Sequence, residues 1–182
     1  MSMVTRASAL VGELARVPAA LQLGSLVFAL LLRSPLLGVY AIASIASHGV
    51  NAALKAASRA CFGNRSWSRR PLGAQACGPF GEDYGMPSGH AQSVGLLAGF
   101  FTLYLLLRRD SPPAPSSRGK GGEAAHTAFL VALVWALAFA VSAQRVSSCH
   151  TAAQVAAGFG VGVTLGAGAW VVYARCRLVI RK

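Results

Sequence analysis

Residues 82–92 read EDYGMPSGHAQ and lead directly into an apolar run at 91–107. Pro87, Ser88 and Gly89 make a turn of the kind that opens a helix and leaves its first backbone N–H groups pointing at an anion. His90 follows at the mouth of that helix, and histidine can transfer a proton near neutral pH. This stretch therefore predicts the start of a membrane helix and an anion-binding turn at the same place.

The composition independently indicates a membrane protein. The chain has 182 residues, of which 54% are hydrophobic and 12% are charged, about half the charge of a typical soluble domain. Apolar runs occupy 17–32, 36–55, 91–107, 128–143 and 151–174. The first run is short, since about 20 residues cross a bilayer, and we prefer a retained helix there to a signal-peptide core. We expect one domain over 1–182, an all-α integral membrane bundle of about five transmembrane helices.

The formal net charge of +12 does not indicate a nucleic-acid partner. The basic residues lie in the short polar gaps between apolar runs, where cytoplasmic anchors and phosphate ligands belong. Apart from the candidate phosphate ligands, the loops on one side of five spans carry five Arg or Lys residues and those on the other carry nine. The richer side is expected to be cytoplasmic, so the loops within 58–86 and 144–149 should face the lumen.

Two segments have simpler interpretations. Residues 110–122 read DSPPAPSSRGKGG, a hydrophilic loop that we expect to be disordered, and residues 175–182 form a basic C-terminal tail. Gly158, Gly162 and Gly166 repeat on one helical face of the last run. Such a stripe of small residues predicts that another helix approaches closely.

A second histidine mirrors the first. His150 opens the last apolar run, 60 residues after His90 and on the same predicted side of the membrane, so we expect the two to converge. Gln154 stands four residues later on the same helical face, where it can accept a hydrogen bond from one imidazole nitrogen and leave the other directed at phosphorus. A carboxylate at this position should serve as well. Arg70 and Arg145 supply planar forks that match phosphate oxygens.

The remaining polar residues leave alternatives open. Lys55 can be a phosphate ligand or a lysine that reaches to the membrane surface. Cys61 and Cys77 can pair if their loop faces an oxidising lumen, or can remain thiols. No cysteine spacing suggests a zinc site, and the carboxylates form no metal cage. We therefore expect no metal ion and no cofactor.

Three short motifs carry a family resemblance. Arg70-Pro71, Pro87-Ser88-Gly89-His90 and Arg145 with His150 resemble the signatures of the type 2 phosphatidic acid phosphatase (PAP2) superfamily. The flanking strings at 49–51, 84–92 and 150–155 are most similar to its dolichyl-diphosphatase branch. The similarity covers roughly residues 49–162, within a PAP2-like core of about 36–174.

The resemblance implies a mechanism and a substrate. His150 would attack the terminal phosphorus to give a phosphohistidine, while His90 would protonate the leaving oxygen and later activate water. The phosphate would be held by Arg70, Arg145, Lys55 and the backbone amides of Ser88 and Gly89. The implied reaction is metal-independent removal of the terminal phosphate of a polyprenyl (dolichyl) diphosphate, in the endoplasmic reticulum membrane with a lumenal site, in support of protein glycosylation. Alternatives are a broader lipid phosphatase for phosphatidate or isoprenoid phosphates, an inactive lipid-binding relative, and a small transporter.

The sequence departs from the family pattern at three positions. Lys55 precedes Arg70 by fifteen residues where the superfamily has seven, so Arg59, Arg65 or Arg69 can take its place. Arg145 precedes His150 by five residues instead of six. Gln154 replaces the usual aspartate, as is familiar in the dolichyl-diphosphatase branch.

Overall fold

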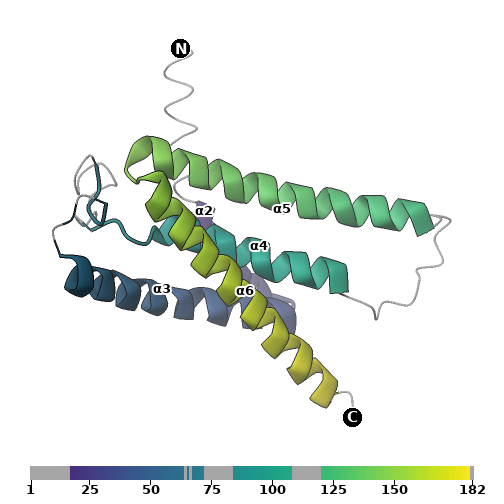
Figure 1. Ribbon diagram of the computed structural model, residues 1–182. Coiled ribbons are helices and arrows are strands. Elements are labelled where there is room, and N and C mark those ends of the chain that lie inside the picture. The colour runs from purple at the N-terminus through teal and green to yellow at the C-terminus, as the bar shows by residue number, and fades with distance from the viewer. Residues whose placement is uncertain (1–16, 64, 66, 72–83, 108–119, 181–182) are drawn as a thin grey trace, which may run out of the picture.

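The computed structural model describes residues 17–63, 65, 67–71, 84–107 and 120–180. Within these ranges the chain forms five helices, as Figure 1 shows: α2 Val17–Leu31, α3 Pro35–Phe62, α4 Gly89–Leu107, α5 Lys120–Ser148 and α6 Ala152–Ile180. The expected all-α fold is confirmed. Helices α3 to α6 are long and apolar enough to cross a membrane, so the protein is an integral membrane protein.

Helix α2 matches the first predicted run but does not have the length of a span. Its 15 residues extend about 22 Å at 1.5 Å per residue, less than the roughly 30 Å hydrocarbon core of a bilayer. It packs beside α3, and Gln22 Oε1 on α2 is 3.0 Å from His48 Nε2 on α3. The part of the chain that the structure describes therefore has four helices of spanning length and one shorter companion.

Several helices extend beyond the apolar runs. Helix α3 continues to Phe62, and α5 begins at Lys120, inside the predicted loop 110–122, the rest of which lies outside the described residues. Helix α6 continues to Ile180 through most of the predicted basic tail. Lysine and arginine are good helix formers, so a change to polar composition ends an apolar run without ending the helix.

The glycine stripe of α6 packs against α4. The backbone carbonyl oxygens that lie against its glycines belong to Ser88, Gln92 and Leu96, one for each of Gly158, Gly162 and Gly166. On the facing helix, Gly95 and Gly99 meet the carbonyl oxygens of Phe159 and Val163. A Cβ atom at any of the five would collide with this backbone. The predicted close helix approach is confirmed, and its partner is α4.

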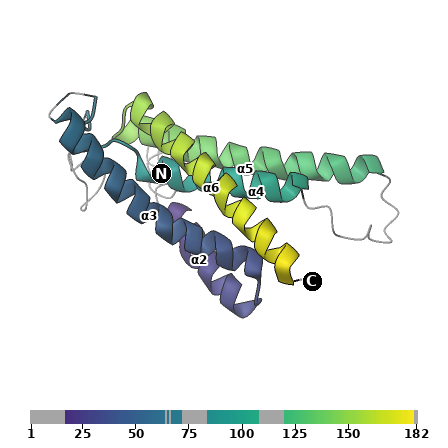
Figure 2. The same cartoon turned by 60° about the horizontal axis from the view of Figure 1, so that its bottom comes forward.

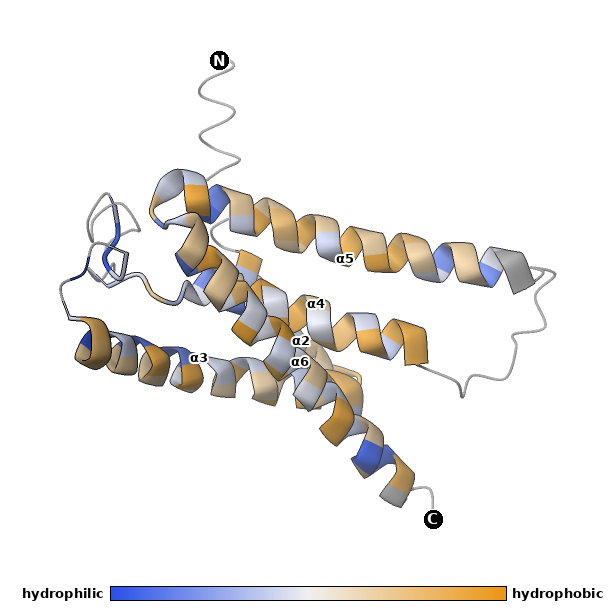
Figure 3. Ribbon diagram, in the orientation of Figure 1, coloured by the Kyte–Doolittle hydropathy of each residue, from blue (hydrophilic) through white to orange (hydrophobic). Residues whose placement is uncertain are grey.

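Helix α4 is the centre of the bundle. Its residues from Ala91 to Phe100 are almost all buried, and Phe100 packs in a cluster with Tyr40 of α3 and Trp170 of α6. A second cluster joins Val94 and Ala98 to α5. The outer surface of α5 is apolar along most of its length (Figure 3), as expected for a helix that faces lipid.

The motif-bearing helix ends gather at one end of the bundle. In both Figure 1 and Figure 2, the C-terminal ends of α3 and α5 lie at the same end as the N-terminal ends of α4 and α6. The three sequence motifs lie at or between these ends. The fold therefore brings the third motif to the first two, although Arg145 follows His90 by 55 residues.

Candidate active site

Gln154 is the residue at which the three motifs meet. Its Oε1 accepts hydrogen bonds from the Thr151 backbone N–H, at 3.3 Å, and lies 3.0 Å from His150 Nδ1. Its Nε2 donates to the carbonyl oxygens of Trp67, at 3.0 Å, and Arg69, at 2.8 Å. The side chain is fully buried, and all of its hydrogen-bonding capacity is used. The Gln154 side chain thus links the segment that leads to the first motif with the turn that carries His150.

The partners of Gln154 determine the tautomer of His150. Two carbonyl acceptors on one side require that side of the amide to be the NH₂ group, so the other side is the oxygen. His150 Nδ1 must then carry the proton that it donates to Oε1. The other ring nitrogen, Nε2, is left with its lone pair. This is the form of imidazole that can act as a nucleophile.

The turn between α5 and α6 fixes the backbone around His150. Thr151 Oγ1 accepts from the Gln154 backbone N–H at 3.3 Å, which together with the return bond to the Thr151 N–H forms a capping box. The His150 N–H donates to the carbonyl of Arg145 at 2.9 Å. Arg145 itself lies in the last turn of α5 and is buried, so the expectation that it belongs to a loop is wrong.

The first motif lies against the second. Arg69 and Tyr84 form an isolated antiparallel bridge, and the Gly85 N–H donates to the Ser68 carbonyl at 3.0 Å. A Cβ at Gly85 would lie 2.9 Å from Cγ of Arg70 and would also collide with the Gln154 amide. Only a residue without a side chain fits between these two groups.

The turn before α4 differs from expectation in one respect. The Ser88 N–H donates to the Gln154 carbonyl oxygen at 3.0 Å, so the prediction that this amide holds phosphate is wrong: the close packing of α4 on α6 uses it. The Ser88 hydroxyl, in contrast, is buried and makes no hydrogen bond. Ser88 keeps a donor for an anion, but the donor is its side chain.

A buried polar network holds this turn in place from α3. Asn51 Nδ2 donates to Gln92 Oε1 at 2.8 Å and to the Pro87 carbonyl at 3.4 Å. Gln92 Nε2 donates to the Ser47 carbonyl at 2.8 Å and to its hydroxyl at 2.7 Å. Gly89 begins α4 beside this network, because a Cβ there would lie 3.2 Å from Asn51 Oδ1. The position of the turn before α4 is therefore determined by side chains of the neighbouring helix.

His150 lies in a positively charged, buried environment. Its side chain is 3% exposed, and burial lowers its pKa to about 4, helped by the charges of Arg70, Arg145 and Lys55 and opposed by the Gln154 hydrogen bond. At neutral pH the imidazole is uncharged. An anion among these cations would relieve their mutual repulsion, which favours a phosphate ligand.

Two of the arginines that could replace Lys55 in the first motif, Arg59 and Arg69, contact another side chain. The guanidinium of Arg59 lies 5.0 Å from the centre of the Tyr84 ring, and that of Arg69 lies 5.9 Å from it. Both can make cation–π contacts with Tyr84, whereas the charge of Lys55 acts on His150. This arrangement favours Lys55 as the cation that completes the first motif.

Two other sequence-based interpretations can be compared with the structure. Cys61 is a free thiol, so it does not pair with Cys77, which lies outside the described residues. Cys149 is disulfide-bonded, and its Sγ accepts from Arg145 Nη2 at 2.9 Å. His90 lies half-buried in the first turn of α4. Its approach to His150 within the reach of one phosphate stays a prediction.

The comparison with protein families agrees with this geometry. The profile of the PAP2 superfamily matches residues 35–178, which include the three motifs, α3, α4, α5 and all but the last two residues of α6. The chain belongs to the PAP2 superfamily. Membership supports a phosphatase that acts on phosphate esters, generally those of lipids, without specifying the substrate. No curated protein and no solved structure was found to match the chain.

Proposed function

We propose that this PAP2 phosphatase removes the terminal phosphate of a polyprenyl diphosphate, such as dolichyl diphosphate, by a metal-independent route through a phosphohistidine. The observation that carries the proposal is the hydrogen bond from His150 Nδ1 to Gln154 Oε1. It presents an unprotonated Nε2 in a site where the charges of Arg70, Arg145 and Lys55 act. A neutral nucleophile and a cluster of cations are what an incoming phosphate requires.

In the proposed first step, His150 Nε2 attacks the terminal phosphorus as the bond from phosphorus to the bridging oxygen breaks. The lipid monophosphate leaves, with a proton from His90. In the second step His90 takes a proton from water, which attacks the phosphohistidine and releases inorganic phosphate. Arg70, Arg145 and Lys55 hold the phosphate oxygens in both steps, together with the Ser88 hydroxyl and the Gly89 amide.

The preference for a diphosphate rests on leaving-group chemistry. A lipid monophosphate is a weaker base than a lipid alkoxide, so its departure needs less proton transfer. The similarity to the dolichyl-diphosphatase branch at 84–92 and 150–155 supports the same substrate. It also supports a place in the endoplasmic reticulum membrane, with the site facing the lumen and the product returning to protein glycosylation.

A direct assay tests this proposal against its alternatives. Protein purified in detergent with EDTA should release phosphate from dolichyl diphosphate faster than from phosphatidate. His150→Gln should abolish turnover, whereas His48→Gln, which alters the histidine paired with Gln22, should retain it. Equal rates on both lipids would favour the broader lipid phosphatase. No turnover of either lipid would favour an inactive lipid-binding relative, and a requirement for added metal would contradict the mechanism.

A further inference from the structure

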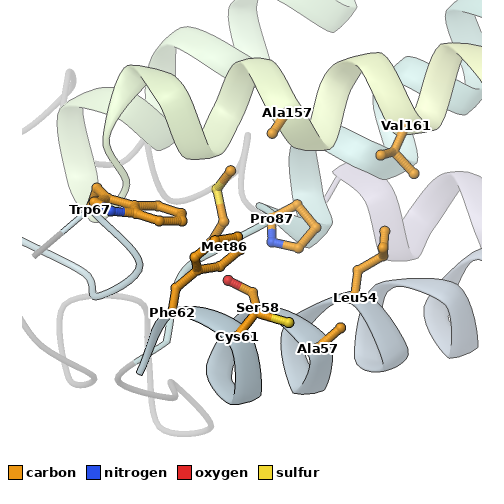
Figure 4. A pocket seen from close by; sticks show the side chains of 10 residues that line it. All are labelled: Leu54, Ala57, Ser58, Cys61, Phe62, Trp67, Met86, Pro87, Ala157 and Val161. Atoms are coloured by element: carbon orange, nitrogen blue, oxygen red, sulfur yellow. The ribbon is translucent and has the colours of Figure 1, made fainter. Parts of the chain in front are cut away.

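An apolar cavity of 370 Å³ lies beside the site, between α3 and α6. Its walls come from α3, the segment between α3 and α4, and α6 (Figure 4). The lining residues are Leu54, Ala57, Ser58, Cys61, Phe62, Trp67, Met86, Pro87, Ala157 and Val161. None of them belongs to the catalytic set proposed above, so the cavity needs an explanation of its own.

The cavity wall adjoins the proposed phosphate site along the chain. Pro87 in its wall is followed by Ser88, and Leu54 is followed by Lys55. The side chain of Trp67 lies beside that of Met86 in Figure 4, and the Trp67 carbonyl oxygen accepts a hydrogen bond from Gln154 Nε2. Two of the residues proposed to hold the phosphate, Lys55 and Ser88, thus directly follow residues of the cavity wall.

The lining is suited to hydrocarbon. Eight of its ten residues offer only apolar or sulfur-containing side chains, the others being Ser58 and Trp67. Phe62 and Trp67 pack with ring centroids 4.6 Å apart. The one hydroxyl, that of Ser58, is buried without a hydrogen-bond partner. Cys61, Phe62 and Trp67 are also exposed, so the cavity lies near the surface of the bundle.

We propose, on the basis of the function proposed above, that this cavity binds the part of a polyprenyl chain that adjoins the diphosphate. A polyprenyl chain has no polar atom beyond its diphosphate, so it matches this lining from its first carbon. Phosphatidate carries two ester groups close to its phosphate. Their carbonyl oxygens would lose water here with only the Ser58 hydroxyl and the Trp67 indole N–H as donors in the lining, and a carbonyl oxygen left without a donor costs roughly 1–3 kcal/mol. Met86, with a flexible and polarisable side chain, can adapt to the methyl branches.

Filling the cavity tests its role in turnover. Ala157→Phe places a ring in the cavity from α6, and Ala156→Phe places the same ring on the exposed neighbouring position, which does not line it. Ala157→Phe should raise KM for a polyprenyl diphosphate by roughly tenfold or more, the scale of a misfit in an apolar pocket. Hydrolysis of methyl diphosphate, which has the same scissile bond and no chain, should be unchanged in both variants. An equal effect on both substrates, or none on either, would overturn the proposal.

Thiol labelling tests occupancy without turnover. With Cys176→Ser, Cys61 remains as the free thiol of the described residues and lines the cavity. A polyprenyl monophosphate in micelles should slow maleimide labelling of Cys61 roughly tenfold, whereas inorganic pyrophosphate should not. If the polyprenyl monophosphate slows labelling of Cys61 but the protein hydrolyses no lipid, the proposed function is refuted and the proposed binding site is supported. If phosphatidate slows labelling of Cys61 as much as the polyprenyl monophosphate does, or if neither lipid slows it, the proposed binding site is overturned even when the enzyme is active.

Discussion

His150 Nδ1 lies 3.0 Å from Gln154 Oε1, and the same glutamine amide donates to two backbone carbonyls of the segment before Arg70. One side chain thus orients the candidate nucleophile and fastens the first motif next to it. In the Ser-His-Asp triad, a carboxylate orients the histidine simply by accepting a hydrogen bond from its Nδ1–H. Here the side chain must also donate two hydrogen bonds to the backbone before Arg70. A carboxylate has no N–H group to do so, which explains in physical terms why an amide occupies this position.

Gln154→Glu should therefore be deleterious, contrary to what the sequence suggests for a carboxylate. Glutamate keeps an acceptor for His150 but replaces two N–H donors with an oxygen that faces the carbonyls of Trp67 and Arg69. We expect kcat to fall on the order of 10- to 100-fold, as when other partners that orient a functional histidine are lost, together with a lower Tm. Steady-state kinetics and thermal unfolding in detergent would measure both.

Gln154→Leu is the comparison for that variant. It removes the acceptor as well as the donors, so it should lose at least as much activity as the glutamate variant. A glutamate variant as active and as stable as the parent would show that the two carbonyl contacts are dispensable. A leucine variant with full activity would show that another group orients His150.

The pH dependence should reflect the low pKa of His150. The pKa of His150 is about 4 in the folded protein and about 6.5 in the unfolded chain. At a pH between these two values, His150 therefore takes up a proton when the protein unfolds. Its contribution to stability is present above pH 6.5 and is lost as the pH falls toward 4, since the unfolded state then binds more protons. The Tm of the parent should fall more between pH 7 and 4.5 than that of His150→Gln, and equal falls would contradict the shifted pKa.

The sequence was most informative where a side chain determines structure locally. The spacing of Gly158, Gly162 and Gly166 predicted a close helix contact, and the step from His150 to Gln154 predicted their hydrogen bond; both are present. The carbonyl acceptors at Trp67 and Arg69 could not be predicted, because every residue carries the same carbonyl and these two lie 87 and 85 residues from Gln154.

Backbone groups also explain the errors. The Ser88 amide was predicted to face an anion because turns that open helices leave such groups free. It donates instead to the Gln154 carbonyl, since glycines bring α6 within hydrogen-bonding distance of that turn. A local motif cannot reveal which distant backbone will reach it.

His90→Ala should distinguish substrates by their leaving groups. If His90 donates the proton to the departing oxygen, its loss should reduce turnover of a polyprenyl diphosphate less than turnover of a polyprenyl monophosphate, whose leaving group is the more basic alkoxide. Phosphate release from the two lipids with the same chain would measure the ratio. Equal losses on both would remove His90 from the role of general acid.

The lumenal orientation can be tested through the segment 110–122. The basic-residue count assigns this segment to the cytoplasmic side, so a glycosylation acceptor inserted there should stay unmodified in microsomes. An acceptor placed within residues 72–83, which the same count assigns to the lumenal side, should be modified and serves as the positive control. Modification of the first and not the second would reverse the orientation.

The contact between α4 and α6 offers a matched pair of variants on one helix. A Cβ at Gly158 would collide with the Ser88 carbonyl, whereas a Cβ at Gly160 would meet nothing within 4 Å. Gly160→Ala should be neutral or stabilising by up to about 1 kcal/mol, the difference in helix propensity. Gly158→Ala should be destabilising by about 1–3 kcal/mol, because the two helices must separate or shift to admit the methyl group.

The same pair links packing to activity. Separating α6 from the Ser88 turn would lengthen the hydrogen bond from the Ser88 N–H to the Gln154 carbonyl and would displace the Ser88 hydroxyl relative to His150. Gly158→Ala should therefore lower kcat as well as Tm, while Gly160→Ala leaves kcat unchanged. If Gly158→Ala lowers Tm but keeps full kcat at a temperature where it is folded, the turn is positioned by the Asn51 network on α3 and not by its contact with α6.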